Sequence, residues 1–151
     1  MHEQTYSIEL VSAQTVAAIT ALSLELWPDC NYEEEKNQWE QLMHSAKDYC
    51  ALVKIDDAYV GFIHISIRYD HVEGAESNNT AYLEGIYVRP AYRKKQIATA
   101  LLSSGEAWAV SKGLNQMASD TEIDNQISQL FHQQAGFTEV SRLVCFIKTI
   151  H

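Results

Sequence analysis

The segment from Tyr82 to Trp108 constrains the fold most, because it combines a strand, a basic turn and a helix in one short stretch. Its first part carries residues suited to a buried pleated surface, namely Leu83, Ile86, Tyr87 and Val88. Pro90 ends this strand, since proline cannot donate to a ladder and disfavours helical geometry in the residue before it. From Lys95 onward the spacing is that of one helix face, with Ile97, Leu101, Gly105 and Trp108 in register.

The turn between this strand and this helix is strongly basic. It holds four of the 11 Lys and Arg residues of a chain whose net charge is -9: Arg89, Arg93, Lys94 and Lys95. The first N–H groups of a helix lack internal partners and carry the positive end of the helix dipole, so phosphate binds there readily. The turn therefore predicts a pyrophosphate site made mainly of backbone amides. The alternative is a solvated turn whose basic residues only aid solubility.

The pattern Val88-Arg-Pro-x-x-Arg-x-x-Gln-x-Ala98 resembles motif A of the GCN5-related N-acetyltransferases (GNAT). In that family the loop amides hold the pyrophosphate of acetyl-CoA, and the preceding strand pairs with pantetheine. The resemblance implies that Ile86, Tyr87 and Val88 meet pantetheine, and that the pyrophosphate is held by Lys94, Lys95, Gln96, Ile97, Ala98 and Thr99. Gln96 stands where the family most often has glycine, so we expect weaker or repositioned binding, with Gln96 in a helical conformation.

The length of 151 residues predicts one domain over residues 1–151, and the 46% content of hydrophobic residues argues against disorder. No run approaches the roughly 20 apolar residues of a membrane span, and residues 1–6 lack the basic and apolar regions of an export signal. The three cysteines are far apart, so we expect reduced thiols in a cytoplasmic protein, with Cys50 and Cys145 in the core.

The charge balance and the histidines bear on possible ligands. The six histidines lack ligand spacing, so we expect no metal site. A sequence pI of about 5.0 argues against nucleic acid and is compatible with a cationic ligand.

The remaining periodicity predicts an order of strands and helices along the chain. Strands are expected over 6–11, 51–55, 59–69, from 82, over 115–119, from Phe137 and over 142–150. Helices are expected over 13–27, 32–46, from 95 to near 113, and after a capping box at 121–124. The last helix should turn Ile127, Leu130 and Phe131 inward and stop at Gly136, and Gly61 should mark a bulge or a close approach. This order matches the GNAT fold, an α/β fold with a mixed central sheet of about seven strands flanked by about four helices.

Four separated blocks are similar to the aminoglycoside 6′-N-acetyltransferases of the AAC(6′)-I type: Ser66-Ile-Arg68, Tyr82–Val88, Met117–Thr121 and Gly136-Phe137. Those enzymes move acetyl from acetyl-CoA onto the 6′-amine of aminoglycosides and so confer resistance. The resemblance implies acetyl-CoA as co-substrate, a small cationic amine as partner, and a homodimer.

Two acidic residues are the candidate catalytic groups. Glu84 lies on the central strand beside the expected thioester, where a carboxylate could take the substrate proton through a water. At pH 7 that deprotonation costs roughly 2–3 kcal/mol for an amine of pKa near 9; the alternative is a Glu paired with a nearby Arg. Asp120 follows the fifth strand, where ligands gather in α/β sheets. The resemblance makes Asp120 a ligand of the substrate ammonium, and the alternative is a helix N-cap.

The resemblance adds further candidates. Trp27 would form the floor of the aminoglycoside site, and Asn125 would contact acetyl-CoA; the alternatives are core packing and a helix-surface amide. On the substrate side His71 stands where relatives carry Tyr, and Ser141 where a relative carries an acid that Glu139 would replace.

His132 occupies the position at which the wider family usually has a general-acid Tyr, and the alternative is a helix-surface His without a role. Two other functions remain open from the sequence. One is a polyamine or other small-amine acetyltransferase, and the other is a non-enzymatic acyl-CoA-binding regulatory module, for which Gln96 and His132 are hints.

Overall fold

A five-stranded sheet forms the centre of the computed structural model, which describes residues 5–151. The strands are β1 (Tyr6–Leu10), β2 (Asp48–Ile55), β3 (Ala58–Arg68), β4 (Thr80–Val88) and β5 (Met117–Ser119). The helices are α1 (Val16–Leu26), α2 (Tyr32–Leu42), α3 (Ile97–Ser111) and α4 (Gln126–Gln134), with a short 3₁₀ turn at Pro90–Tyr92. Residues 1–4, on which the expectation of no export signal partly rests, lie outside the described residues.

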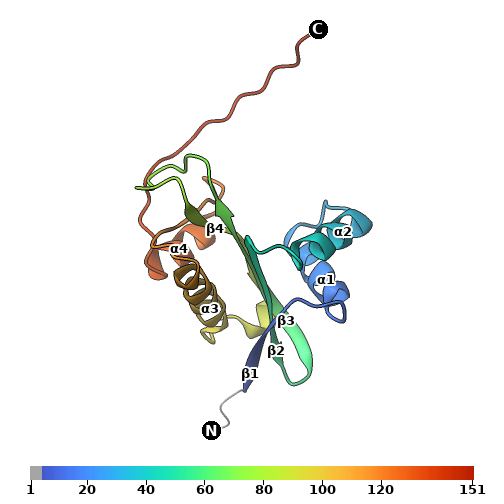
Figure 1. Ribbon diagram of the computed structural model, residues 1–151. Helices are drawn as coiled ribbons and strands as arrows, with labels where there is room; N and C mark the ends of the chain where they lie inside the picture. Colours follow the sequence, from blue (N-terminus) through green and yellow to red (C-terminus); the bar gives the residue numbers. More distant parts are fainter. Residues whose placement is uncertain (1–4) are drawn as a thin grey trace.

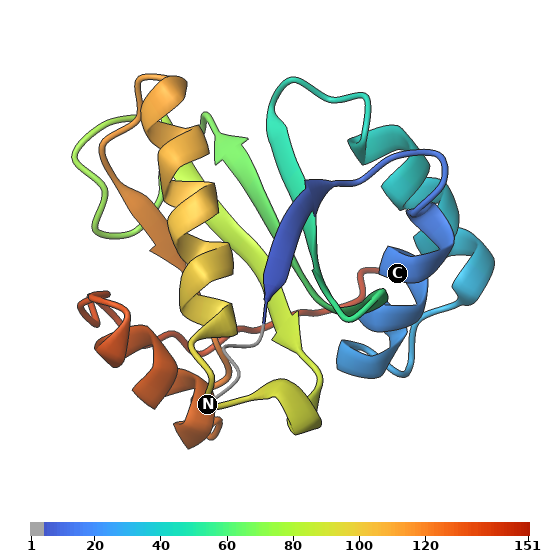
Figure 2. The same ribbon diagram turned by 90° about the horizontal axis from the view of Figure 1, so that it is seen from below.

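The strands follow the order β1-β2-β3-β4-β5, antiparallel up to β4, whereas β5 runs parallel to β4. Helices α1 and α2 cover one face of the sheet, and α3 and α4 lie on the other (Figures 1 and 2). The predicted mixed sheet and four helices are thus confirmed.

The core has two parts, one on each face of the sheet. Ile63 of β3 and Leu101 of α3 are fully buried on one face, while Phe62 of β3 and Ile19 of α1 are fully buried on the other. Alternate residues of β3 supply both parts, as the period of two in a strand dictates.

Strands β2 and β3 form a hairpin with a tight turn, and the expectation for Gly61 is confirmed nearby. Asp56 and Asp57 form its two-residue turn with φ of 48° and 64°, the left-handed pair that suits the twist of a hairpin. The pairing register shifts next to Gly61, where Val60 is the extra residue of β3, and a Cβ at position 61 would stand 2.6 Å from the Tyr87 carbonyl oxygen. Gly61 therefore marks both a bulge and a close approach of β3 to β4.

The predicted last strand is wrong, and the sheet has five strands among the described residues rather than about seven. Residues 138–151, the C-terminal segment, leave the body of the molecule in an extended path (Figure 1). A strand needs a partner for its backbone, and no strand of residues 5–151 runs beside this segment. Cys145 is accordingly exposed instead of buried, whereas Cys50 is in the core, where burial raises the pKa of its thiol to about 12.

Helix α4 begins later than the capping box at 121–124 predicts. Its N-cap is Asn125, whose Oδ1 accepts a hydrogen bond from the Ser128 N–H at 3.1 Å. Gly136, with φ of 97°, ends the helix as expected. Phe131 packs on the core, but Ile127 is 85% and Leu130 54% exposed, so the predicted inward face is only partly right. The reason is that α4 lies beside the short edge strand β5, which covers little of its surface.

Candidate active site

Strand β4 has an open stretch of backbone in the middle of the fold. Strand β3 pairs with it along residues 80–88, but β5 pairs only with residues 81–83. Within residues 5–151, the backbone from Glu84 to Val88 therefore has a strand on one side only. An extended ligand can add to such an edge by main-chain hydrogen bonds.

The basic turn continues directly from this open edge. Two of its cations fix the turn: Arg93 donates from Nε to the Val88 carbonyl oxygen at 2.8 Å, and Arg89 pairs with both carboxylate oxygens of Glu25. Hydrogen bonding to Glu25 raises the pKa of Arg89. Lys94 and Lys95 are exposed at the outer side of the turn.

The basic turn leads directly into the N-terminus of α3. In the part of the chain that is described, no side chain caps this helix, and its first turn holds no acidic residue. The first backbone bond here runs from the Ala100 N–H to the Gln96 carbonyl, so the amides of residues 97–99 have no partner in the preceding turn. The geometry is that of an anion site at a helix N-terminus.

Gln96 does not have the helical conformation that the sequence led us to expect. Its φ is 62°, as is that of Lys94, so both residues are left-handed rather than helical. A side chain costs roughly 1–2 kcal/mol in that conformation, and glycine avoids the cost. Backbone strain, as well as access to phosphate, thus explains why glycine suits position 96.

A β-bulge places Glu84. Opposite β3, His64 pairs with Gly85 and Ile65 with Leu83, so Glu84 is the extra residue of β4. Bulges re-aim side chains and are frequent next to active sites. The Glu84 carboxylate accepts hydrogen bonds from Ser66 Oγ at 2.6 Å and from Arg68 Nη2 at 2.9 Å.

Arg68 and Tyr82 connect Glu84 to Asp120. The Arg68 guanidinium lies 3.4 Å from the Tyr82 ring centroid, and the Tyr82 hydroxyl donates a short hydrogen bond to Asp120 Oδ2. Burial and this hydrogen bond raise the pKa of Tyr82 to about 12. We call Arg68, Tyr82, Glu84 and Asp120 the carboxylate cluster. Asp120 is not an N-cap, because the following helix is capped by Asn125.

The sequence identified both carboxylates of the cluster but did not single out Arg68 or Tyr82. The pairing of Glu84 with Arg68 is the one that the alternative for Glu84 describes, a glutamate paired with a nearby arginine. A signal for Arg68 and Tyr82 was present, since both lie in the blocks that carry the resemblance, 66–68 and 82–88. Strand alternation also places Arg68 on the same face as Ser66.

Trp27, the C-cap of α1, reaches the same strand. Its indole occupies the space over Gly85, where a Cβ would lie 2.7 Å from the ring carbon Cη2. The ring also makes an edge contact with Phe62, with centroids 6.0 Å apart. Trp27 therefore packs on the core and borders the residue next to Glu84.

Three further candidates lie on outer segments. His71 is 80% exposed in its side chain and pairs with Glu73, while Glu139 pairs with Arg142. Ser141 is exposed on the C-terminal segment. The start of this segment runs beside the loop after β3, because Val140 fills the space next to Gly74.

His132 is half-buried and joins α4 to β5. Its Nδ1 lies 2.7 Å from the Ser128 carbonyl oxygen, which can only accept, so Nδ1 donates there; in the neutral imidazole Nε2 then accepts from the Ser119 hydroxyl at 2.7 Å. The histidine is therefore a link between two elements rather than a surface residue. No group of three or more His, Cys, Asp or Glu side chains in residues 5–151 could hold a metal ion, and no helix among them is long and apolar enough to cross a membrane.

Comparison with known proteins gives one family. The model of the acetyltransferase (GNAT) family matches residues 9–137. The aminoglycoside N(6′)-acetyltransferase type 1 of Acinetobacter genomosp. 13 is 38% identical over 141 residues, which covers 93% of this chain and 96% of that protein. The enzyme of the same name from Serratia marcescens is 35% identical and covers 86% and 90%.

The solved structures that resemble this chain include enzymes of the same kind. AAC(6′)-Iy in complex with the bisubstrate analogue CoA-S-monomethyl-acetylneamine superposes with a TM-score of 0.92 at 30% identity, over 97% of this chain and 99% of that one. AAC(6′)-Ih from Acinetobacter baumannii gives a TM-score of 0.91 at 36% identity, over 97% and 100%.

Proposed function

The chain belongs to the GNAT family of acetyltransferases, and on that premise we propose that it transfers acetyl from acetyl-CoA to the 6′-amine of aminoglycosides. Such an activity confers resistance to these drugs. The observation that carries the proposal is that the open edge of β4 and the carboxylate cluster adjoin each other at Glu84. An acyl donor on that edge and a cationic acceptor at the cluster would meet there.

Acetyl-CoA, the acyl donor, would be bound mainly by backbone groups. We propose that the main chain of Ile86, Tyr87 and Val88 pairs with pantetheine, and that the amides from Lys94 to Thr99 hold the pyrophosphate. The uncapped N-terminus of the 15-residue helix α3 supports this assignment. Asn125 uses its Oδ1 to cap α4, which leaves its amide NH₂ group as a donor for the co-substrate.

The aminoglycoside, the acyl acceptor, would be bound by side chains. Asp120 and Glu84 would hold ammonium groups of the drug, with the indole of Trp27 as an apolar floor. His71, Glu139 and Ser141 would form the outer rim, since the C-terminal segment begins beside the loop that holds His71. The net charge of -9 favours the approach of a polycation, most strongly at low salt.

The reaction is a direct transfer. The 6′-ammonium gives up a proton, which Glu84 accepts through a water molecule. The amine nitrogen then bonds to the acetyl carbonyl carbon, the carbon–sulfur bond breaks, and a second proton from the nitrogen passes to the leaving thiolate. The products are an amide and the CoA thiol, with no acyl-enzyme. Holding the two reactants together supplies up to about 7–11 kcal/mol of the barrier reduction.

Three further expectations belong to the same proposal. Residues 1–151 act as one GNAT domain, the enzyme works in the cytoplasm, and it forms a homodimer. The three free cysteines fit a reducing compartment, and the exposed apolar C-terminal segment favours self-association.

The test is release of CoA thiol from acetyl-CoA with tobramycin, kanamycin, spermidine or a lysine peptide. We expect turnover on the aminoglycosides, and at least a tenfold lower kcat/KM for Asp120→Ala. Asp124→Ala is the matched control, because it removes an exposed carboxylate from the same loop. Turnover only on spermidine or peptide would reject the drug assignment, and binding of acetyl-CoA without thiol release from any amine would favour a regulatory module.

The role of Glu84 needs its own measurement. If Glu84 is the base, Glu84→Gln lowers kcat and removes the acidic limb of the pH–rate profile. If Glu84 only binds the ammonium, the same variant raises KM and leaves that limb in place.

A further inference from the structure

The carboxylate of Glu25 joins the end of helix α1 to residues that follow 62 and 64 positions later in the chain. It accepts hydrogen bonds from the Tyr87 hydroxyl at 3.2 Å and from Arg89 Nη2 at 2.9 Å. Arg89 Nε lies 3.2 and 3.1 Å from the two carboxylate oxygens. Tyr87 is in the open stretch of β4, and Arg89 begins the basic turn. Glu25 is therefore bonded to the strand and to the turn that would hold acetyl-CoA.

The geometry of this ion pair distinguishes it from an ordinary surface pair. The side chains of Glu25 and Arg89 are 37% and 40% exposed, and single pairs at such sites usually contribute little to stability. A guanidinium that faces a carboxylate with two nitrogens is directional, and the Tyr87 phenol adds a further directional bond. The Tyr87 ring is itself held, since its centroid lies 6.4 Å from that of Phe62 and 5.7 Å from Arg93 Cζ. Glu25 is thus suited to fixing a position rather than to adding much stability.

Helix α1 carries the indole of Trp27 at its end. Trp27 is the C-cap of the helix, and its backbone N–H donates to the Ser23 carbonyl oxygen at 2.8 Å, so its position follows that of the last helical turn. Helix α1 also packs on the sheet through apolar side chains such as Ile19, which is fully buried. Apolar contacts are non-directional, whereas the bonds of Glu25 define one position. Through the helix, Glu25 sets where the indole stands over Gly85.

We propose that Glu25 is a positioning residue for the acetyl transfer, which holds the floor of the acceptor site in place relative to the bound acyl donor. This role rests on the proposed function and adds a residue outside the groups assigned above to acetyl-CoA and the drug. Distance matters here, because a misplacement of about 1 Å can cost on the order of 100-fold in rate. Since Glu25 is bonded to the donor side and belongs to the helix of the acceptor side, it also couples the two sites. Binding of CoA then favours binding of the aminoglycoside, and the reverse holds by linkage.

The first test is whether CoA tightens the binding of tobramycin, measured by titration calorimetry with and without saturating CoA. We expect tobramycin to bind about fivefold more tightly to the CoA complex of the wild type, and close to equally with and without CoA for Glu25→Ala. Glu25→Gln keeps an oxygen acceptor at the same reach and should recover part of this coupling. A wild type without coupling, or equal coupling in the wild type and Glu25→Ala, would overturn the proposal.

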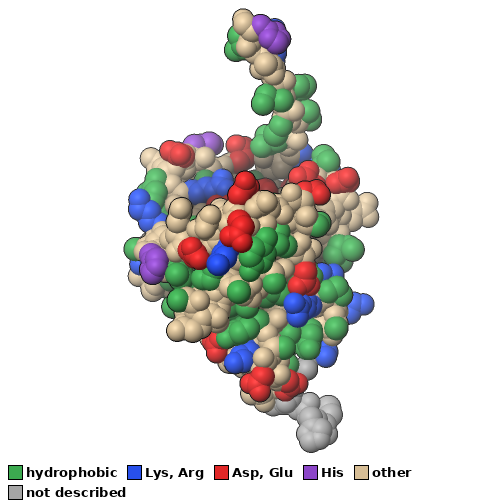
Figure 3. Space-filling model, turned by 90° about the vertical axis from the view of Figure 1, so that its right-hand side faces the viewer, with side chains coloured by type: hydrophobic (Ala, Val, Ile, Leu, Met, Phe, Trp, Pro, Cys, Tyr) green, Lys and Arg blue, Asp and Glu red, His purple; other side chains and the backbone are tan. Residues whose placement is uncertain are grey.

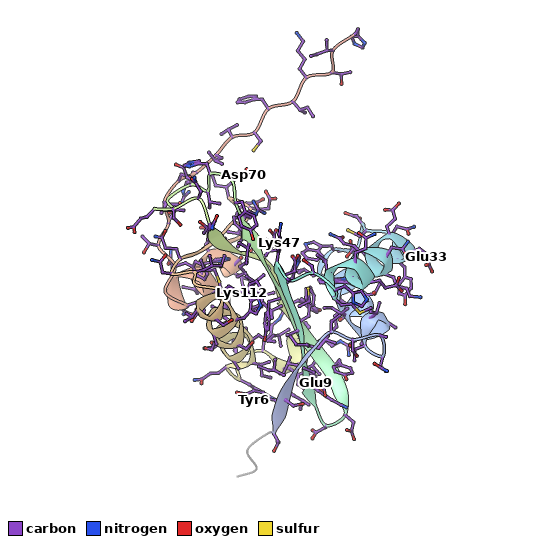
Figure 4. The ribbon with its side chains drawn as sticks, viewed as in Figure 1. Tyr6, Glu9, Glu33, Lys47, Asp70 and Lys112 are labelled. Carbon is purple, nitrogen blue, oxygen red and sulfur yellow. The ribbon has the colours of Figure 1, made fainter. Side chains whose placement is uncertain are left out.

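Glu33→Ala is the matched control for the lost charge. Glu33 is an exposed carboxylate of the neighbouring helix α2, on the outer side of that helix in Figure 4. Figure 3 shows several acidic side chains on the side of the molecule where α1 and α2 lie, so removal of one takes away only part of the general attraction for a polycation. The control should bind tobramycin slightly more weakly in both states and keep the wild-type coupling. Loss of coupling in Glu33→Ala as well would point to a general charge effect and reject the proposal.

A double-mutant cycle tests whether Glu25 acts through Arg89. Arg89→Ala should reduce the coupling between CoA and tobramycin to the same extent as Glu25→Ala, because each change breaks the same ion pair. The double variant should lose no more than either single variant. A further loss in the double variant would show two independent effects and would reject a role of Glu25 through Arg89.

The second test needs no acceptor, so it separates the role of Glu25 from the choice of substrate. The chain has three tryptophans, and labelling with 5-fluorotryptophan gives each of them a fluorine NMR signal. Trp27→Phe assigns the signal of Trp27, and the buried Trp39 serves as internal reference. We expect CoA to shift the Trp27 signal of the wild type but not that of Glu25→Ala.

The fluorine signal distinguishes two kinds of failure. If no amine yields CoA thiol but the Trp27 signal still responds to CoA through Glu25, the coupling stands and the proposed drug acetylation is wrong. If the Trp27 signal of the wild type does not respond to CoA, or responds equally in Glu25→Ala, the role of Glu25 is wrong whatever the enzyme acetylates.

Discussion

The indole of Trp27 and the missing side chain of Gly85 fit each other: a Cβ at residue 85 would lie 2.7 Å from Cη2 and 3.0 Å from Cζ2 of the ring. Gly85 follows the bulge at Glu84, so the bulge turns the carboxylate to Arg68 while leaving a gap for the indole. One irregularity in β4 therefore positions both a charged and an apolar part of the proposed acceptor site.

Gly85→Ala is expected to push the indole away from β4. Overpacking of this kind costs about 1–3 kcal/mol in the free energy of unfolding, and the KM for tobramycin should rise. Urea unfolding and steady-state kinetics measure the two effects. Trp27→Leu in the Gly85→Ala background should recover part of the lost stability, because the clash is removed. Strictly additive losses would show that the two residues do not touch in solution.

Gln96→Gly is expected to stabilise the fold. The left-handed φ of 62° costs a side chain roughly 1–2 kcal/mol, and the greater freedom of glycine in the unfolded chain offsets part of that gain. The melting temperature should rise slightly, and titration calorimetry should give equal or tighter binding of CoA. Lys95→Gly is the control, since residue 95 is not among the positive-φ residues and should lose stability. Equal destabilisation by both changes would contradict the strained turn.

Arg68→Met is expected to lower the KM for aminoglycosides. It removes a positive charge beside Glu84, and one charge at about 6 Å in water is worth roughly threefold in affinity for a cation. The effect should shrink as salt is added. Lys112→Met is the control, because it removes an exposed cation at the C-terminal end of α3, away from the carboxylate cluster and the outer rim. A higher KM for Arg68→Met would instead mean that the guanidinium holds Glu84 in its working position.

Asp48 makes the fold sensitive to acid. Burial alone would raise the pKa of Asp48, but hydrogen bonds with His64 at 2.8 Å and from Ser45 at 2.7 Å outweigh burial and lower it. Its contribution to stability is therefore full above the unfolded pKa of about 3.9 and is lost as pH falls through the lower native pKa.

Asp48→Asn should accordingly cost about 1–3 kcal/mol at pH 7, and the difference from wild type should shrink towards pH 3. Urea unfolding between pH 3 and pH 7 measures this. Asp57→Asn, at a fully exposed carboxylate, should follow the wild-type profile. A difference for Asp48→Asn that does not vary with pH would mean that the carboxylate is not held ionised by its partners.

Local patterns predicted the elements that lie near their partners in sequence. The alternation in β3 and the helical stripe of α3 follow from apolar spacing alone, because each element buries one face against a neighbour. The two-residue turn at Asp56 and Asp57 was also predictable, since few residue pairs accept its left-handed backbone.

The geometry around Glu84 was not predictable in this way. A bulge depends on the register between two strands, and the run Leu83-Glu-Gly-Ile86 is equally compatible with regular pairing. The left-handed Gln96 is similar, because no property of glutamine favours that conformation; the surrounding turn imposes it. Both features lie at the proposed site.

The prediction of a last strand in the C-terminal segment was wrong for a different reason. The apolar run at residues 143–147 is typical of a buried strand, but composition alone does not specify a partner strand, and in the structure the run is exposed. Ile127 and Leu130 were placed inward on the same grounds, and their helix surface also lacks cover within one copy.

The open edge of β4 has an evolutionary consequence. If acetyl-CoA is recognised through the main chain of residues 84–88 and the amides at the start of α3, most substitutions leave the hydrogen-bonding groups of that recognition in place, because every residue except proline offers them. The acceptor site is instead made of a few side chains. A lineage of such enzymes can therefore change its range of drugs by single substitutions at the cluster or the outer loops, while the capacity to use the acyl donor is inherited intact.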